Sequence, residues 1–317
     1  MTMPEASDRE APDVSIIVPA FNAAKTLGAT LESAIEQSAC RIEVICVDDG
    51  STDGTLALAQ SYNDKVRVLT GPNQGVSNAR NRGIAESCGQ WVVFLDADDL
   101  LHKDTLATRL AHAERVNCDV VICNWQEISD DQAKPPKKRS ANVALIEQDP
   151  ELAFASTAWA TTAALMYRRA LVDRIGGFRQ DLPVIQDARF AFDAARAGAR
   201  FGYSDHVGAD YRIIEGSLSR RNPVQFHRDI LTNILQIEDS WRERKALSEA
   251  RRDVVAATLN VASRGLFREG DQAYFDAVEA LIRVAPRLSS HARIAAPLAR
   301  IVGLANARRV LSLVGIS

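Results

Sequence analysis

Three acidic side chains follow a long apolar run in the first third of the chain. Residues 91–95 are Trp-Val-Val-Phe-Leu, and Asp96, Asp98 and Asp99 come directly after them. An unbroken apolar run predicts a strand that is covered on both faces, as in a parallel sheet. The carboxyl ends of such strands are where open α/β sheets bind ligands. Because clustered carboxylates repel one another, we expect a divalent cation among them.

The spacing of Asp96 and Asp98 favours one shared site. Alternate residues of an extended segment point the same way, so both carboxylates face one side while the intervening alanine turns inward. Mg²⁺ and Mn²⁺ are commonly held by one or two carboxylates together with substrate phosphates. Asp48 and Asp49 end another apolar run, so they should reach the same sheet edge. Either one caps the following turn, or one accepts a hydrogen bond from a nucleotide base N–H.

The elements that position these acids alternate along the chain. Strands are expected at residues 14–18, 42–47, 66–69, 91–95, 120–123, 161–167, 200–203 and 207–213, and helices at 23–37, from 55, at 75–87, 101–116, 171–178 and 185–197. This alternation predicts βαβ units and an α/β fold with a Rossmann-like, mostly parallel central sheet flanked by helices. Residues 129–142 form a charged, proline-containing loop, either a solvated insertion or a flap near the substrate.

The last third of the sequence has an entirely helical pattern after Pro223. We therefore predict a flexible N-terminus over residues 1–12, a catalytic α/β domain over 13–218 and a helical C-terminal region over 219–317. Residues 280–317 contain no acid, and their arginines alternate with apolar residues. These helices either pack on the catalytic domain with arginines outward or dock on an anionic inner-membrane surface.

Composition narrows the classes of function. The net charge of −3 argues against nucleic-acid binding. The five cysteines form no C-x-x-C pair, so we expect reduced core thiols. The first dozen residues lack an apolar segment, and no apolar run approaches the roughly 20 residues of a membrane-spanning helix. We expect a cytoplasmic protein, with the basic C-terminal region as a peripheral contact to the inner face of the cytoplasmic membrane.

Four segments in a fixed order resemble the motif set of family 2 glycosyltransferases. They are Ser-Ile-Ile-Val-Pro-Ala-Phe-Asn (15–22), Val-Asp-Asp-Gly-Ser-Thr-Asp-Gly-Thr (47–55), Asn-Gln-Gly-Val-Ser-Asn-Ala-Arg-Asn-Arg-Gly-Ile (73–84) and Phe-Leu-Asp-Ala-Asp-Asp (94–99). The resemblance covers residues 12–220 and weakens after residue 125. It implies the glycosyltransferase A fold, a nucleotide-sugar donor and inversion at the anomeric carbon.

The resemblance also implies roles for individual residues. For the donor base, it implies that Pro19 and Phe21 line the pocket with Asn22 nearby, and that Asp49 accepts the base N–H, most often of uracil. Arg80 would face the nucleotide, and Asp96 would contact hydroxyls of the ribose or sugar. Asp98 would bind the Mn²⁺ or Mg²⁺ that bridges the diphosphate. A later segment, Tyr-Arg at 211–212, resembles a feature that closes over the diphosphate. Arg212 either pairs with phosphate oxygens or is a surface arginine.

Inverting transfer also needs a base for the acceptor hydroxyl. The resemblance assigns it to Asp187, at the start of a predicted helix, although Gln186 stands where the family has glutamate; the plainer interpretation of Asp187 is a helix cap. Trp159 either stacks on an acceptor sugar or belongs to the core. His206 and His227 are candidate extra metal ligands, or ordinary histidines.

These observations predict an inverting, metal-dependent glycosyltransferase that moves a sugar from a UDP-sugar to a glycan or lipid-linked acceptor in cell-surface polysaccharide biosynthesis. The alternative is a catalytically inactive nucleotide-sugar-binding partner protein, which only Gln186 favours. A phosphoacceptor receiver domain would need a pair of acids after the first strand, where Pro-Ala-Phe stands instead. A dinucleotide-binding oxidoreductase is disfavoured because no G-x-G-x-x-G follows any predicted strand.

Overall fold

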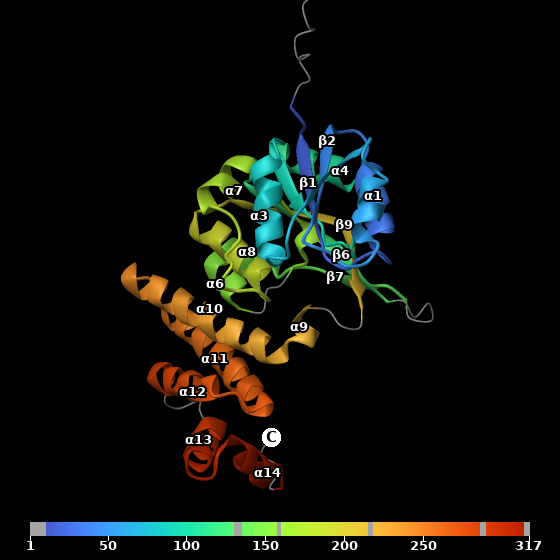
Figure 1. The fold of residues 1–317 in the computed structure, drawn as a ribbon. Helices are drawn as coiled ribbons and strands as arrows, with labels where there is room; N and C mark the ends of the chain where they lie inside the picture. The colour runs from blue at the N-terminus through green and yellow to red at the C-terminus, as the bar shows by residue number, and fades with distance from the viewer. Residues whose placement is uncertain (1–10, 130–134, 157–159, 215–217, 286–289, 314–317) are drawn as a thin grey trace, which may run out of the picture. The chain divides into compact units, whose positions relative to one another are not determined.

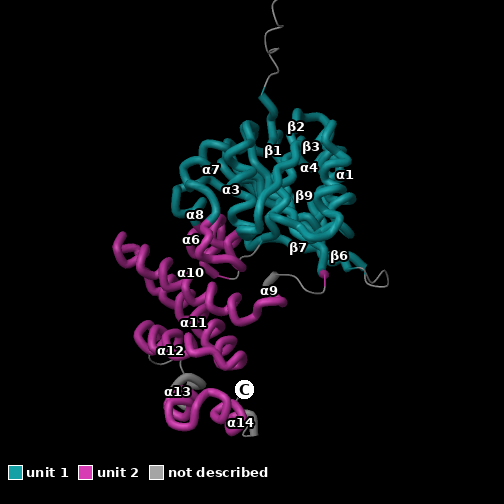
Figure 2. The backbone as a smooth tube through the Cα atoms, in the orientation of Figure 1, with its two compact units in different colours: residues 1–143, 160–178, 193–213 teal, residues 144–159, 179–192, 214–317 magenta. Residues whose placement is uncertain are grey.

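The chain folds into two compact units. A computed structural model describes residues 11–129, 135–156, 160–214, 218–285 and 290–313 (Figure 1). The first unit comprises residues 1–143, 160–178 and 193–213, and the second comprises residues 144–159, 179–192 and 214–317 (Figure 2). Two segments inside the predicted catalytic domain, 144–159 and 179–192, thus belong to the helical unit.

The first unit contains a single sheet, in which nine strands are described. They are β1 (Val14–Ala20), β2 (Ile42–Asp48), β3 (Val66–Thr70), β4 (Trp91–Phe94), β5 (Leu100–Leu101), β6 (Val120–Ser129), β7 (Lys137–Arg139), β8 (Leu165–Arg168) and β9 (Phe201–Ile213). Their order is β3-β2-β1-β4-β8-β6-β9-β5, with β7 paired to β6.

Helices surround this sheet and make up the second unit. The first unit has α1 (Leu27–Ile35), α2 (Thr55–Gln60), α3 (Val76–Glu86), α4 (Thr105–Val116), the 3₁₀ turn η1 (Thr162–Ala164) and α7 (Arg169–Ile175). The others are α5 (Val143–Gln148), α6 (Pro150–Ala155), α8 (Gln186–Arg196), α9 (Leu218–Arg221), α10 (Pro223–Glu243), α11 (Glu249–Glu269), α12 (Ala273–Val284), α13 (Ser290–Val302) and α14 (Leu304–Leu313). Helix α8 is divided between the units, because its residues from Asp193 onward belong to the first.

The first half of the sheet is parallel, as the apolar runs predict. Strand β1 lies between β2 and β4, and both pairings are parallel in register from Val14 onward. Every residue of β1 and β4 is buried. In Figure 1, α3 lies on one side of these strands and α1 on the other, which explains why the residues of β1 and β4 are apolar apart from Ser15, whose hydroxyl donates to Glu43.

The second half of the sheet is mixed in direction. Strand β8 runs antiparallel to both of its neighbours, β4 and β6, whereas β6 and β9 are parallel. An apolar run reports burial on both faces and not strand direction, so the sequence did not reveal that β8 runs antiparallel to its neighbours. The two strands expected at 200–203 and 207–213 form the single strand β9, whose pairing with β6 shifts near Asn124.

The segment predicted as a charged loop is partly a strand. Lys137–Arg139 forms β7 and pairs antiparallel with Trp125, Gln126 and Glu127 of β6. The pairing is supported by an ion pair between Arg139 and Glu127 at 2.8 Å. Prolines at 135 and 136 precede β7 and do not interrupt its ladder.

Buried charge joins the helices of the second unit. Glu238 of α10 is fully buried and receives hydrogen bonds from Arg242 at 2.6 Å and from Arg283 of α12 at 2.8 Å. Arg283 of the basic segment therefore pairs with a buried carboxylate while its own side chain remains 48% exposed. Of the helices described, none combines the length and apolar character needed to cross a membrane.

The close approach of α3 to β1 gives a test of the fold. A Cβ added at Gly83 would lie 2.4 Å from Cγ2 of Ile17, which is fully buried in β1. We expect Gly83→Ala to lower the free energy of unfolding by about 1–3 kcal/mol through overpacking, measured by urea denaturation. In Gly28→Ala the nearest atom is 3.8 Å away, so this control in α1 should be neutral or slightly stabilising. Equal losses in both variants would contradict the packing described.

Candidate active site

The order of the first four strands brings three candidate residues to one edge of the sheet. β1 is followed by Phe21, β2 by Asp49 and β4 by Asp96. The N–H of Asp49 donates to the carbonyl of Ala20 at 2.8 Å, so the two chains stay together beyond the strands. Chain order reverses at β1, with β2 on one side and β4 on the other. In open α/β sheets, such a reversal opens a crevice at the carboxyl ends of the strands.

The end of β1 carries one exposed aromatic ring and one structural asparagine. Phe21 is 48% exposed although it is a large apolar residue, whereas Pro19 is buried within the strand. Asn22 adopts a φ of 50°, and its side-chain oxygen accepts the N–H of Thr52 at 2.8 Å. Asn22 therefore holds the loop after β2 against β1, and Phe21 is left as the apolar surface that a planar base would cover.

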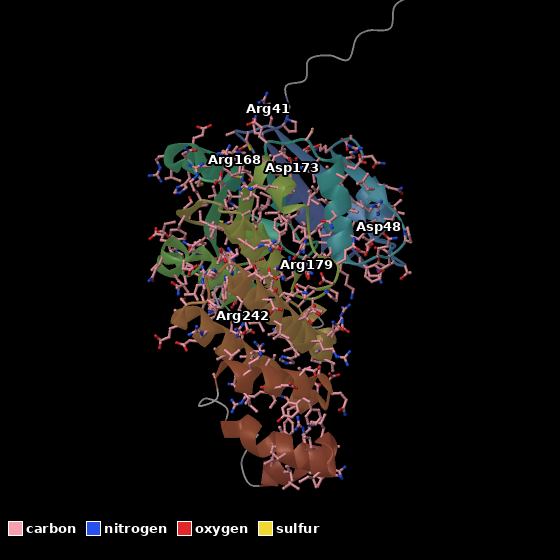
Figure 3. The ribbon with its side chains drawn as sticks, turned by 90° about the vertical axis from the view of Figure 1, so that its left-hand side faces the viewer. Arg41, Asp48, Arg168, Asp173, Arg179 and Arg242 are labelled. Atoms are coloured by element: carbon pink, nitrogen blue, oxygen red, sulfur yellow. The ribbon has the colours of Figure 1, made fainter. Side chains whose placement is uncertain are left out.

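The paired acids after β2 have separate partners. Asp48 (labelled in Figure 3) is buried and accepts hydrogen bonds from the hydroxyl of Thr70 at 2.8 Å and the N–H of Ser51 at 3.2 Å. Asp49 is also buried and accepts the N–H groups of Gln74 at 2.9 Å and Gly75 at 2.8 Å. Each Asp49 oxygen keeps acceptor capacity, since an ionised carboxylate offers about four lone-pair sites.

Arg80 of α3 is a buried cation beside the acids. Its Nη2 donates to Oδ1 of Asp96 at 2.5 Å, and its guanidinium lies 5.0 Å from the ring centroid of Phe178. The side chain is only 2% exposed. Within the described part of the chain, its Nε and Nη1 have no hydrogen-bond partner. Arg80 thus contacts one of the predicted acids and retains two donor atoms.

The three acids after β4 differ in their surroundings. Asp96 is 34% exposed at its side chain and also accepts the hydroxyl of Thr162 at 3.3 Å. Asp99 is buried and accepts the hydroxyl of Thr161 at 3.2 Å and the backbone N–H of Arg212 at 2.9 Å. Burial, together with the neighbouring carboxylates, raises the pKa of Asp99 well above its ordinary value.

Asp98 is partly buried, and its negative charge is only partly offset by its neighbours. Burial, followed by the negative charge of Asp96, raises the pKa of Asp98 to about 6, and the nearby Arg212 guanidinium acts in the opposite direction. A bound cation would relieve this repulsion, so the donor set fits a Mg²⁺ or Mn²⁺ ion that phosphate oxygens complete. Among the described residues, there is no group of three metal-ligating side chains.

Arg212 is placed at this edge by β9. Its Nε donates to the backbone carbonyl of Asp98 at 3.1 Å, and its backbone N–H donates to Asp99. Arg212 is partly buried, and both its backbone and its side chain contact the acidic segment. A guanidinium beside Asp98 is suited to pair with phosphate oxygens.

The proposed base belongs to the second unit. Asp187 lies in the first turn of α8, and its carboxylate accepts the N–H of Ala188 at 2.8 Å. Gln186 is buried, and its side-chain Oε1 has no hydrogen-bond partner among the described residues. Trp159, the predicted acceptor contact, lies outside the described residues.

The remaining candidates from the sequence are the two histidines considered as extra metal ligands and the five cysteines. His206 contacts the hydroxyls of Thr105 and Ser204, both at 2.9 Å, and burial lowers its pKa to about 4. His227 packs against Gly265. Three cysteines are buried, whereas Cys40 is intermediate and Cys88 is exposed.

Thr161 and Thr162 are site residues that the sequence did not reveal. They enter only through their hydrogen bonds to Asp99 and Asp96. Their segment was expected to be a strand, but it forms η1 immediately before β8. The adjacent pair of threonines is the one feature that marks it, and such pairs are too common to indicate a site.

Comparisons with known proteins agree with this fold. Residues 15–176 match the family model described as Glycosyl transferase family 2. The succinoglycan biosynthesis protein ExoO of Rhizobium meliloti is 30% identical over 227 residues, which cover 68% of this chain and 65% of that protein. An uncharacterised glycosyltransferase of Escherichia coli, YibD, is 31% identical over 65% of this chain and 63% of its own length. The chain therefore spans slightly less than two thirds of these relatives.

Solved structures share the fold. The S. aureus TarS fragment 1–349 in complex with UDP-GlcNAc has a TM-score of 0.66 at 23% identity, covering 93% of this chain and 89% of that one. A mannosyltransferase from Pyrobaculum calidifontis in complex with GDP-Man and Mn²⁺ has a TM-score of 0.55 at 19% identity, covering 96% and 88%. The chain belongs to glycosyl transferase family 2, and the predicted glycosyltransferase A fold is confirmed.

The raised pKa of Asp98 predicts a pH-dependent cost of folding. The folded protein binds this proton more tightly than the unfolded chain, so stability is highest below the ordinary pKa of 3.8 and is lost as the pH rises through about 6. In chelator and without nucleotide, we expect Asp98→Asn to raise Tm at pH 7.5, with the gain disappearing toward pH 4.

The matched control has the opposite sign. A hydrogen bond from Arg179 (labelled in Figure 3) lowers the pKa of Asp181 to about 2, so Asp181→Asn should lower Tm at pH 7.5. An Asp98→Asn protein less stable than wild type at pH 7.5 would contradict the environment described for Asp98.

Proposed function

We propose that this protein is an inverting glycosyltransferase that transfers a sugar from a UDP-sugar donor to a glycan or lipid-linked acceptor. The observation that carries the proposal is the charge arrangement after β4. Three carboxylates lie there with the cations of Arg80 and Arg212, at the sheet edge that also holds Phe21 and Asp49. Such an edge accommodates a base, a ribose and a diphosphate in sequence.

The donor's base would lie between Phe21 and Asp49. The exposed ring offers a stacking surface, and the carboxylate accepts an imide N–H. Asp96, which Arg80 and Thr162 orient, is placed to accept hydroxyls of the ribose or sugar. Uracil is favoured because the motif around Asp49 most often reads it in the family; support also comes from TarS, whose structures include UDP and UDP-GlcNAc complexes.

The diphosphate would lie beside Asp98 and Arg212. Asp98 is the residue that would hold Mn²⁺ or Mg²⁺, and the solved mannosyltransferase complex with Mn²⁺ supports a divalent ion in this family. When bound, such an ion neutralises charge on the departing nucleoside diphosphate. Arg212 contributes a second, fixed positive charge from β9, and its guanidinium is held by the Asp98 carbonyl.

Asp187 is proposed as the general base. Its carboxylate accepts the proton of the acceptor hydroxyl while that oxygen attacks the anomeric carbon from the face opposite the leaving group. Its hydrogen bond from the Ala188 N–H orients the carboxylate at the start of α8. Gln186 removes one negative charge from beside this base, compared with the glutamate of the family.

The acceptor is proposed from the relatives and the basic segment. The name of ExoO assigns it to succinoglycan biosynthesis, which supports a role in making a cell-surface polysaccharide. The arginines of residues 280–317 other than Arg283 would favour a peripheral contact with the inner face of the cytoplasmic membrane, where a lipid-linked acceptor lies. Trp159 is proposed to stack on an acceptor sugar.

Donor binding is tested by thermal shift. We expect UDP or a UDP-sugar together with Mn²⁺ to raise Tm, because a ligand that binds only the folded state stabilises it by mass action. At a ligand concentration of about 100 times Kd, the gain is roughly 2.7 kcal/mol. Asp98→Ala should abolish the metal-dependent part. A GDP-specific shift would contradict the uracil assignment, and a shift of equal size in chelator would contradict the role of Asp98.

The base is tested by comparing binding with turnover. We expect Asp187→Asn to reduce transfer or donor hydrolysis by about 10²–10⁴-fold while UDP affinity stays within about twofold, since a general base acts on the acceptor proton and not on donor binding. Asp173→Asn, an exchange of an acid on α7, serves as control and should retain activity. A wild-type protein that binds UDP-sugar and turns over no donor would instead favour the inactive binding protein.

A further inference from the structure

The turn at residues 161–163 contacts a different ionisable side chain through each of its residues. The hydroxyl of Thr161 donates to Asp99 and that of Thr162 to Asp96, at 3.2 and 3.3 Å. The carbonyl of Ala163 accepts Nη1 of Arg109 at 2.8 Å. Arg109 is itself fully buried. A surface turn needs no such set of charged partners, so this one has a fixed position relative to the acids.

Asp99 joins this turn to β9. One oxygen accepts the Thr161 hydroxyl and the other accepts the backbone N–H of Arg212. Arg212 then donates its Nε to the carbonyl of Asp98, the residue preceding Asp99. Asp98 and Asp99 together therefore hold Arg212 at two points, its backbone N–H and its guanidinium. Only 1% of the Asp99 surface is exposed, so it is not itself available to a substrate.

We propose that Asp99 is a positioning residue that sets the Arg212 guanidinium and the Asp98 carboxylate in place for the diphosphate of the donor. The inference rests on the proposed function and deepens it. Burying a carboxylate is costly, and this one lies beside two further acids, so apolar packing would be the cheaper structural solution. The cost is offset where the buried group fixes charged partners that must meet a ligand with small tolerance.

Asp48 provides a matched control within the same sheet. It is also 1% exposed, and it also accepts one hydroxyl and one backbone N–H, from Thr70 and Ser51. It is the last residue of β2, on the side assigned to the base, and does not contact Arg212 in the hydrogen bonds described. Asp48→Asn should therefore disturb folding much as Asp99→Asn does, without a selective effect on phosphate recognition.

The test compares the affinities of UDP and uridine for the full-length chain in Mn²⁺ by calorimetry. We expect Asp99→Asn to weaken UDP by about tenfold or more and uridine by less than about threefold, so the ratio of the two affinities falls. Asp48→Asn should leave that ratio unchanged whatever its Tm. A purely structural role for Asp99 would lower both affinities together or neither, and that result would overturn the proposal.

Thr161→Val removes only the hydroxyl and covers the case in which Asp99→Asn does not fold. It should lower the UDP-to-uridine ratio in the same direction by a smaller factor. If both variants fold and neither changes the ratio of UDP to uridine affinity, the positioning role is overturned. If Asp99→Asn does not fold, an unchanged ratio in Thr161→Val alone overturns it. Failure of the wild type to bind UDP or GDP would overturn the proposed function instead, whereas wild-type UDP binding with unchanged ratios would leave the proposed function standing.

Discussion

The repulsion among three carboxylates that follow β4 is the constraint on which the rest of the first unit depends. Asp96, Asp98 and Asp99 lie within four consecutive positions just after a buried strand. Two arginines offset their charge, Arg80 from α3 and Arg212 from β9. Burial nevertheless raises the pKa values of Asp98 and Asp99. An edge with unrelieved negative charge is suited to a ligand that arrives with a cation.

The surrounding structure can be understood as support for those two arginines. Asp49 fixes the residues before α3 by accepting the N–H of Gly75, and α3 carries Arg80. Gly83 allows the same helix to approach β1 closely. On the other side, β9 pairs with β6 along its length and delivers Arg212 at its carboxyl end. Both cations therefore come from elements whose positions the sheet determines.

The second unit is organised by ion pairs inside a helical bundle. Glu238 joins α10 to α12 through Arg283, and Glu151 of α6 accepts the indole N–H of Trp241 in α10 at 2.6 Å. Asp149 at the start of α6 pairs with Arg251 of α11 at 3.0 Å. These pairs explain why residues 144–159 belong with the helices although the sequence places them between strands. Asp187 lies in this unit, so the proposed proton transfer and the donor site use different parts of the chain.

The sequence by itself determined the first four strands, the acids at their ends and the family, because apolar runs bounded by turns and short-range motifs are local signals. Asp49, Arg80, Asp96 and Asp98 were identified in this way and occupy the same unit. Only the tertiary structure decided the antiparallel direction of β8, the strand β7, and the contacts of Thr161, Thr162 and Asp99. The contacts of the threonines and Asp99 join residues 62 or more positions apart, and neither these contacts nor the direction of a strand leaves a periodic signal in a single sequence.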